Sequence, residues 1–168
     1  KFRSYQDTWQ TSSRNMADRH YVKDCWIEGA VDYFYGGGDV LLEGCTLYNV
    51  RSGSVIVAPC HKEGTKFGYV FSNCTIDGNE LANDNKTALG RPWHNAPKTV
   101  WLNTTMKIGI KPEGWNNMGA IPALFAEYNS MDADGNPVDL SNRRTEYEYT
   151  DGDTGQKVTG TCKATLTD

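Results

Sequence analysis

The chain has 168 residues and a mass of 18.7 kDa, enough for one domain with a buried core. Its 17 glycines, 9 tyrosines and 5 tryptophans are typical of a turn-rich β protein and exclude a disordered chain. The net charge of −4, the scattered lysines and arginines and the lack of an apolar run of roughly 20 residues argue against a nucleic-acid or membrane partner.

Three short segments repeat one pattern along the chain, and a fourth repeats it imperfectly. Each alternates apolar and polar residues around a turn-forming residue and a cysteine, and ends near Gly or Asn. They are residues 22–29, 42–49 and 70–78, with a degenerate copy at 100–109 in which Thr105 takes the place of the cysteine. Copies spaced by roughly 20 to 30 residues are typical of a solenoid whose coils stack on one another. We therefore predict an all-β fold, a parallel β-helix.

The cysteines do not follow a metal-binding pattern. Cys25, Cys45 and Cys74 occupy the same place in the three repeats, so we expect an inward-facing ladder of small side chains. No CxxC pair occurs and the count of five is odd, so we expect most of them to be reduced and buried. Cys60 beside His61 is a weak zinc signal, because no further ligand lies at short spacing. We expect no metal and no other cofactor.

Two further stretches have compositions that predict turns or irregular structure. The glycines at 36–38 fit neither a dinucleotide-binding loop nor a phosphate loop, and we expect a tight turn there. Residues 119–168 are rich in Asp, Gly, Asn and Thr, above all at 130–139 and 150–160. The sequence therefore predicts a single domain over residues 1–168, with an irregular tail from 119 to 168 packed on the solenoid.

Serine hydrolase chemistry is excluded by the motifs. There is no GxSxG, and His20, His61 and His94 have no partner pattern, so we expect each on the surface or in a loop. Three other short motifs occur in order: YQDT at 5–8, VDYFYG at 31–36 and LGRPW at 89–93. Taken singly, they are typical of a turn, a core strand and a surface anchor.

Taken as an ordered set, these motifs resemble the QDT, DFxFG and LGRPW signatures of the pectin methylesterases. The segment FAEY at 125–128 resembles the closing segment of that family, so the likeness extends from residue 5 to residue 128. The middle motif departs from the more usual DFIFG, and residues 11–19 form a longer loop than in many relatives, which we expect to reshape the cleft. The resemblance implies a right-handed parallel β-helix, an extracellular or cell-surface location and pectin as the partner.

The resemblance also assigns catalytic roles. Asp32 would be the nucleophile that attacks the C6 methyl ester of a galacturonosyl unit. Asp7 would protonate the departing methanol and then deprotonate the hydrolytic water. Arg91 would pair with Asp32, favouring its charged form, and Gln6 would donate a hydrogen bond to the oxyanion.

Aromatic residues of the motifs are the candidate substrate platform. Trp93, with Tyr33 or Tyr35, would stack on the apolar face of the sugar rings. Family members are longer, and a GxYxE-like strand and a QAV segment that carries a second oxyanion glutamine do not occur here. We therefore expect a truncated domain whose partners include its own N-terminal part and whose activity alone is low.

Two alternatives stay open from the residues. One is another pectin-active β-helix: a lyase, which needs a calcium-binding carboxylate cluster and a basic residue, or a polygalacturonase, which needs a different set of aspartates. The other is a non-catalytic pectin-binding or structural solenoid, in which the aromatics bind sugar and the aspartates only cap turns.

Overall fold

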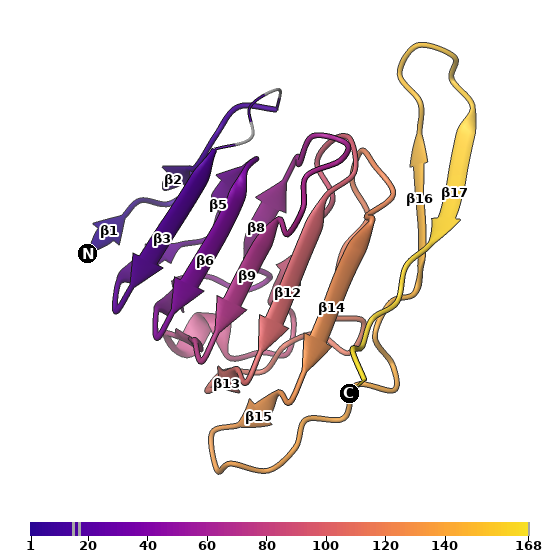
Figure 1. The fold of residues 1–168 in the computed structure, drawn as a ribbon. Helices are drawn as coiled ribbons and strands as arrows, with labels where there is room; N and C mark the ends of the chain where they lie inside the picture. The colour runs from indigo at the N-terminus through magenta and orange to yellow at the C-terminus, as the bar shows by residue number, and fades with distance from the viewer. Residues whose placement is uncertain (15, 17, 168) are drawn as a thin grey trace.

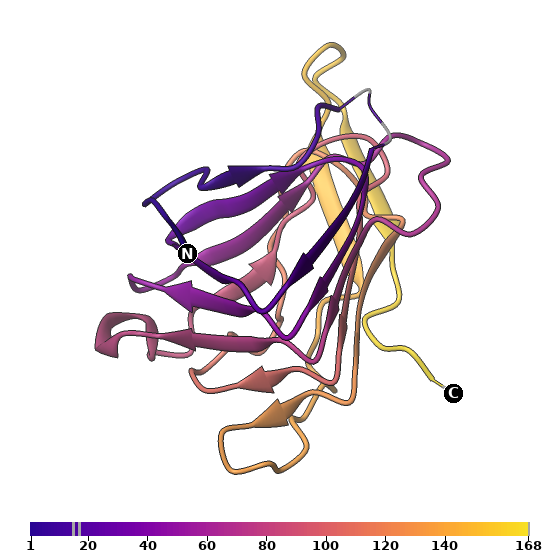
Figure 2. The same ribbon diagram turned by 60° about the vertical axis from the view of Figure 1, so that its left-hand side comes forward.

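The computed structural model describes residues 1–14, 16 and 18–167. The chain forms a parallel β-solenoid of about five turns, in which strands of successive turns stack into three sheets (Figure 1). Figure 2 shows the three sheets enclosing a shared interior, with the N-terminal strands in front. The predicted all-β parallel β-helix is confirmed.

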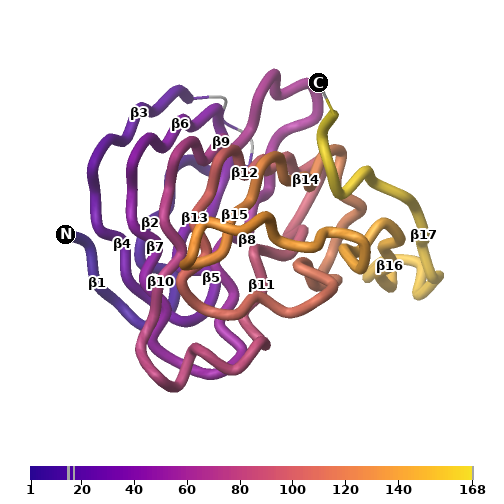
Figure 3. Tube along the Cα trace, turned by 90° about the horizontal axis from the view of Figure 1, so that it is seen from below, coloured from indigo at the N-terminus to yellow at the C-terminus, as the bar shows by residue number. Residues whose placement is uncertain are grey.

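The strands of each sheet are parallel neighbours from successive turns. The first sheet contains β1 (Phe2–Arg3), β4 (Trp26–Gly29), β7 (Thr46–Asn49), β10 (Thr75–Gly78), β13 (Thr105–Met106) and β15 (Met131–Asp132). The second contains β2 (Trp9–Gln10), β5 (Val31–Gly36), β8 (Val55–Pro59) and β11 (Ala88–Gly90). The third contains β3 (Arg19–Lys23), β6 (Asp39–Glu43), β9 (Tyr69–Ser72), β12 (Lys98–Leu102) and β14 (Leu124–Tyr128). Figure 3 shows these coils side by side from β3 to β14.

One residue with a positive φ makes each corner between the third and first sheets. These residues are Asp24, Gly44, Asn73, Asn103 and Asn129, with φ between 50° and 62°. Gly, Asn and Asp are the residues that adopt this left-handed conformation at the lowest cost. The turn-forming residue in each sequence repeat is therefore the corner of a coil.

The cysteine ladder follows these corners. Because Thr46 pairs with Trp26 and with Thr75, the preceding residues Cys25, Cys45 and Cys74 stand at equivalent places in adjacent coils. All five cysteines are free thiols, and Cys25 alone among them is half-buried rather than buried. The predicted equivalence of Thr105 is wrong, because Thr105 pairs with Thr75 and the buried Thr104 therefore occupies the cysteine position.

Aromatic side chains fill the interior between the sheets. Phe71 and Trp101, on adjacent strands, stack with ring centroids 3.9 Å apart, and Trp115 stacks on Phe125 at 4.5 Å. These side chains are fully buried. Burying a large aromatic side chain stabilises a fold by roughly 2–3 kcal/mol, so this stack is a main source of cohesion between coils.

The glycine turn after β5 packs against Thr11 and Asp18 of the loop between β2 and β3. Gly36 and Gly38 have φ of 112° and 83°, as a tight turn requires. A Cβ on Gly38 would lie 2.7 Å from the carbonyl oxygen of Asp18, so only glycine allows this approach. The buried Thr11 hydroxyl donates to the Gly37 carbonyl at 2.7 Å. Asn15 and Ala17 lie outside the described residues, and the effect of this loop on the cleft stays a prediction.

The segment 119–168 is more regular than the sequence indicated. Strands β14 and β15 belong to the solenoid, and β16 (Glu146–Thr150) and β17 (Lys157–Thr161) form an antiparallel hairpin. The expectation of an irregular tail from residue 119 is therefore corrected for these strands. Arg143, between β15 and β16, forms a buried ion pair with Glu127 of β14, whose Nε–Oε2 distance is 2.6 Å. The division into domains stays a prediction.

The described chain is almost free of helix. A short 3-10 helix, η1 (Glu80–Ala82), is capped by the Asn79 side chain, which accepts a hydrogen bond from the Ala82 N–H. Within the described residues, no helix reaches the length and apolarity needed to cross a bilayer.

Candidate active site

Three charged side chains of the sequence motifs meet on the outer side of the second sheet. Asp7 follows Gln6, which bridges to Val31, and its N–H donates to the Val31 carbonyl at 3.2 Å. Asp32 is the second residue of β5. Arg91 directly follows β11, and its N–H donates to the Val57 carbonyl at 3.0 Å. Parallel stacking of successive turns thus brings together residues far apart in the sequence.

Both aspartates have left-handed backbone conformations. Asp7 has φ of 53° and Asp32 has φ of 49°. Such conformations cost non-glycine residues free energy, of order 1 kcal/mol, and are frequent at functional sites. Asp is among the residues that tolerate them best, because its short polar side chain can bond locally.

A β-bulge sets the direction of the side chains on β5. Val31 pairs with Val55 and Phe34 with Val57, so β5 has one residue more than β8 in this interval. The interruption lets Asp32 and Tyr35 line one cleft, while Tyr33 and Phe34 both enter the core.

Tyr33 is therefore wrong as a substrate-binding residue. Its side chain is fully buried, and its hydroxyl donates to Asn49 Oδ1 at 3.3 Å. Burial raises the pKa of Tyr33 well above its usual value, and the hydrogen bond only partly offsets this. Regular strand alternation would have placed Tyr33 and Tyr35 on the same face, and the bulge is the reason that they differ.

Arg91 holds Asp32 through two hydrogen bonds. Nε donates to Oδ1 at 2.9 Å and Nη2 donates to Oδ2 at 2.6 Å. The exposed fraction is 28% for the Arg91 side chain and 9% for that of Asp32, so solvent screens the pair only in part. This bidentate geometry orients both carboxylate oxygens.

Asp7 has a different environment, although it lies nearer to solvent. Partial burial raises the pKa of Asp7, and the negative charge of Asp32 raises it further, while the positive charge of Arg91 partly offsets both. The site therefore contains one carboxylate fixed by a guanidinium and a neighbouring carboxyl group that holds its proton more readily than usual. Such a pair is suited to nucleophilic attack combined with acid and base catalysis.

These groups line a cleft of about 230 Å³. Gln6, Tyr35 and Trp93, which are candidate site residues from the sequence, also line it, and the rings of Tyr35 and Trp93 meet edge to face at 6.0 Å. Ala58 and Met118 line it too, and neither was predicted. Ala58 is the position on β8 that pairs with Tyr35 and could have been found from the strand register, whereas Met118 lies in a loop without a motif.

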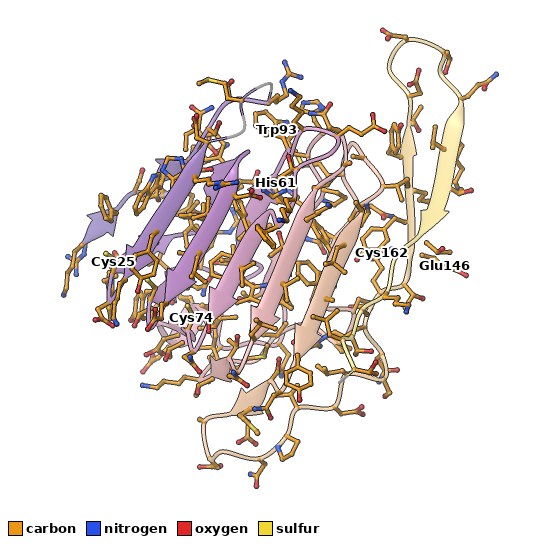
Figure 4. All side chains as sticks on the ribbon, viewed as in Figure 1. Cys25, His61, Cys74, Trp93, Glu146 and Cys162 are labelled. Atoms are coloured by element: carbon orange, nitrogen blue, oxygen red, sulfur yellow. The ribbon has the colours of Figure 1, made fainter. Side chains whose placement is uncertain are left out.

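His61 lies in a loop, as expected, but it is buried rather than on the surface. Its Nδ1 accepts a hydrogen bond from the Lys98 N–H at 2.9 Å, and its ring packs edge-on against Tyr69. Burial lowers the pKa of His61 to about 4 and raises that of Cys60 to about 11. Figure 4 shows His61 and Trp93 toward the end of the sheets opposite Cys25 and Cys74.

In the described part of the chain, no group of three or more His, Cys, Asp or Glu side chains could hold a metal ion.

Comparison with known proteins gives the family of the chain. A sequence model of the pectinesterase family matches residues 1–158. The chain belongs to the pectinesterase family. Pectinesterase 31 of Arabidopsis thaliana is 31% identical over 156 residues, a match that covers 89% of this chain and 47% of that protein. The probable pectinesterase A of Aspergillus niger is 32% identical over 151 residues, covering 88% of this chain and 43% of that protein.

Solved pectinesterase structures share the fold. The pectin methylesterase of Aspergillus niger has a TM-score of 0.72 and 29% identity, over 85% of this chain and 46% of its own. The enzyme from carrot has a TM-score of 0.72 at 22% identity, which supports the fold alone, over 99% of this chain and 50% of its own. The chain spans about half the length of the relatives that it matches.

Proposed function

We propose that the protein hydrolyses the methyl esters on the C6 carboxyl groups of polygalacturonan and releases pectate and methanol. The observation that carries this proposal is the bidentate Arg91–Asp32 pair beside Asp7, whose pKa is raised, in a cleft with an aromatic wall. Membership of the pectinesterase family supports the same reaction class.

In the first step, a carboxylate oxygen of Asp32 attacks the C6 carbonyl carbon of a methyl-esterified unit. The carbonyl oxygen becomes an oxyanion, to which the Gln6 side-chain amide can donate a hydrogen bond. Collapse of this intermediate breaks the bond to the methoxy group, and the protonated carboxyl group of Asp7 transfers its proton to that oxygen. Methanol leaves, and an anhydride joins Asp32 to the substrate.

In the second step, Asp7 is ionised and acts as the base. It takes a proton from a water molecule, whose oxygen attacks the C6 carbonyl of the anhydride. The C6–O bond to Asp32 breaks, which restores the Asp32 carboxylate and the proton on Asp7 and leaves a galacturonic acid unit, which loses its proton to the solvent. Arg91 remains paired with Asp32 through both steps, because its role is orientation and charge.

The substrate follows from the walls of the cleft. Trp93 and Tyr35 offer aromatic surface for the apolar face of a pyranose ring, and Ala58 leaves room between them and the aspartates. Because pectin is a wall polymer found outside the cell, we propose a secreted protein that acts in the cell wall or at the cell surface.

Methanol release from highly methylated pectin tests this proposal. We expect the chain to release methanol and the Asp32→Asn variant to release none, while Asp134→Asn, on an exposed turn, keeps the parental rate. Asn tolerates the left-handed backbone of Asp32, so this variant should keep the parental fold.

Two further readouts separate the alternatives. A lyase would generate unsaturated products and a polygalacturonase new reducing ends, both without methanol. Binding of pectin that survives both Asp7→Asn and Asp32→Asn, in a parent that releases no methanol, would refute the esterase and favour a non-catalytic solenoid.

A further inference from the structure

The reaction cleft crosses the strands of the second sheet, from the first turn to the last. Its lining residues come in order from Asp7, Asp32 on β5, Ala58 on β8, Arg91 after β11, and finally Met118. These strands are spatial neighbours in that same order. A polymer that lies along the cleft therefore runs lengthwise along the solenoid and leaves it, at one end, over Met118.

Directly beyond Met118 lies a second and larger cavity of about 670 Å³. Asn117 borders this cavity and Met118 borders the cleft, so adjacent residues separate the two. Hydrogen bonds hold the segment 117–119, which separates the two, on both sides. The Gly119 N–H donates to the Pro92 carbonyl at 2.9 Å, beside Trp93, and Asn117 Oδ1 accepts from the Glu148 N–H of β16 at 3.2 Å.

One face of the β16–β17 hairpin forms the remainder of this cavity. Glu146 pairs with Thr161 and Glu148 with Thr159, so these four exposed side chains share one face of the two strands. The buried Tyr147, between the two glutamates, points the other way. Figure 1 shows the hairpin beyond β14, at the C-terminal end of the solenoid, and Figure 4 labels Glu146 at its base.

The charges around this cavity are balanced. Arg144 is half-buried, and its guanidinium donates to the carbonyls of Trp115 and Glu146, at 3.0 and 3.4 Å. No carboxylate of the described residues forms an ion pair with it. Glu148 is paired with Lys157 at 2.6 Å. The cavity thus combines a guanidinium free of any ion pair, the Glu146 carboxylate and two threonine hydroxyls.

We propose that this cavity is a second binding site for galacturonan, which extends the cleft beyond Met118 and takes a methyl-esterified stretch of the polymer. The inference rests on the proposed function. A methyl ester is neutral, so its carbonyl oxygen can accept from Arg144 without placing a second negative charge beside Glu146. The ring hydroxyls can donate to Glu146 and exchange hydrogen bonds with Thr159 and Thr161. An ionised galacturonate would meet the Glu146 carboxylate and is disfavoured.

Binding in the Asp32→Asn background tests the site without turnover. The probes are a methyl-esterified galacturonan trimer, as the short ligand, and a methyl-esterified decamer, as the long one. We expect Thr159→Val with Thr161→Val to weaken decamer binding about tenfold and to leave trimer binding unchanged, because each lost hydrogen bond costs a few-fold in affinity. The matched control is Thr46→Val with Thr75→Val on the first sheet, which should change neither affinity.

The charge preference has its own test. In the same Asp32→Asn background, the protein should bind the esterified decamer more tightly than the de-esterified decamer, and the added Glu146→Lys substitution should raise affinity for the de-esterified decamer several-fold. Equal loss of trimer and decamer binding in the threonine variant, or no loss at all, would overturn the second site. These binding measurements do not depend on methanol release, so an unsubstituted chain that releases no methanol leaves the inference intact. If the unsubstituted chain releases methanol but the threonine variant binds the decamer as tightly as before, the second site is refuted and the proposed function stands.

Discussion

The Arg91–Asp32 pair allows the effects of geometry and of charge to be separated by two substitutions. Arg91→Lys keeps the positive charge but replaces the two-pronged guanidinium with a single ammonium group. Arg91→Gln keeps one hydrogen-bond donor and removes the charge. The first variant therefore disturbs mainly the orientation of Asp32, whereas the second also changes the field at Asp7.

The structure sets the size of each effect. Arg91 makes two charge-assisted hydrogen bonds, at 2.9 and 2.6 Å, and Asp32 is 9% exposed. Losing one such bond costs about 2 kcal/mol, which is about 30-fold in kcat/KM if the carboxylate must be oriented in the transition state. Removing the charge that faces the largely buried Asp32 costs more, about 3–5 kcal/mol, so we expect a loss of kcat/KM of roughly a hundredfold to several thousandfold in Arg91→Gln.

The pH dependence distinguishes the two variants. The positive charge of Arg91 lowers the pKa of Asp7, so its removal raises that pKa. Asp7 must be protonated to release methanol, and the alkaline limb of the rate profile reports its ionisation. Arg91→Gln should therefore shift this limb to higher pH, and Arg91→Lys should leave it in place. A parental rate in Arg91→Lys, or the same limb in both variants, would refute the assigned roles.

Three further predictions concern stability. The pKa of His61 is about 4 in the folded protein, against an ordinary value of 6.5. The free energy of unfolding should therefore be highest above pH 6.5 and fall by about 3 kcal/mol as the pH drops from 6.5 through 4. The melting temperature of His61→Asn, which keeps an acceptor for Lys98, should vary less over this range. Glu127→Gln leaves a buried guanidinium unpaired and should cost about 3–5 kcal/mol in urea unfolding, against less than about 1 kcal/mol for Glu148→Gln in an exposed pair. The pKa of Asp7 is raised on folding, so the folded state loses stability as the pH rises through that pKa. Asp7→Asn should be inactive, yet its melting temperature should be higher than that of the parent at neutral pH and equal to it below pH 3.8. A lower melting temperature at neutral pH would contradict the raised pKa.

Local sequence patterns sufficed for the solenoid because each coil repeats the same physical problem. A residue able to adopt positive φ must make each corner, and a small side chain must follow it into the core. Asp24, Gly44 and Asn73 meet the first need, and the cysteines after them meet the second. The fourth copy was misplaced by one residue because two threonines follow Asn103, and only the strand pairing distinguishes the buried Thr104 from Thr105.

The tail was harder to predict because its stabilising contacts are distant in the sequence. Strand β14 has a buried Glu127, which alone would argue against a core strand. Its charge is compensated by Arg143, and Ser130 donates to it as well at 2.9 Å. A pairing of this kind has no local signature, so the composition of the segment indicated irregular structure where two strands complete the solenoid.

Tyr33 shows why ordered motifs found the charged residues of the cleft but not all of its walls. The motif VDYFYG suggests alternation, which would place Asp32 and Phe34 on one face and the two tyrosines on the other. The bulge opposite β8 shifts this alternation by one residue and turns Asp32 and Tyr35 to the same side. A strand with regular pairing could not present its second and fifth residues to one cleft. The bulge and the left-handed φ of Asp32 therefore act together, because they direct this residue of a core strand into the cleft, within reach of Arg91.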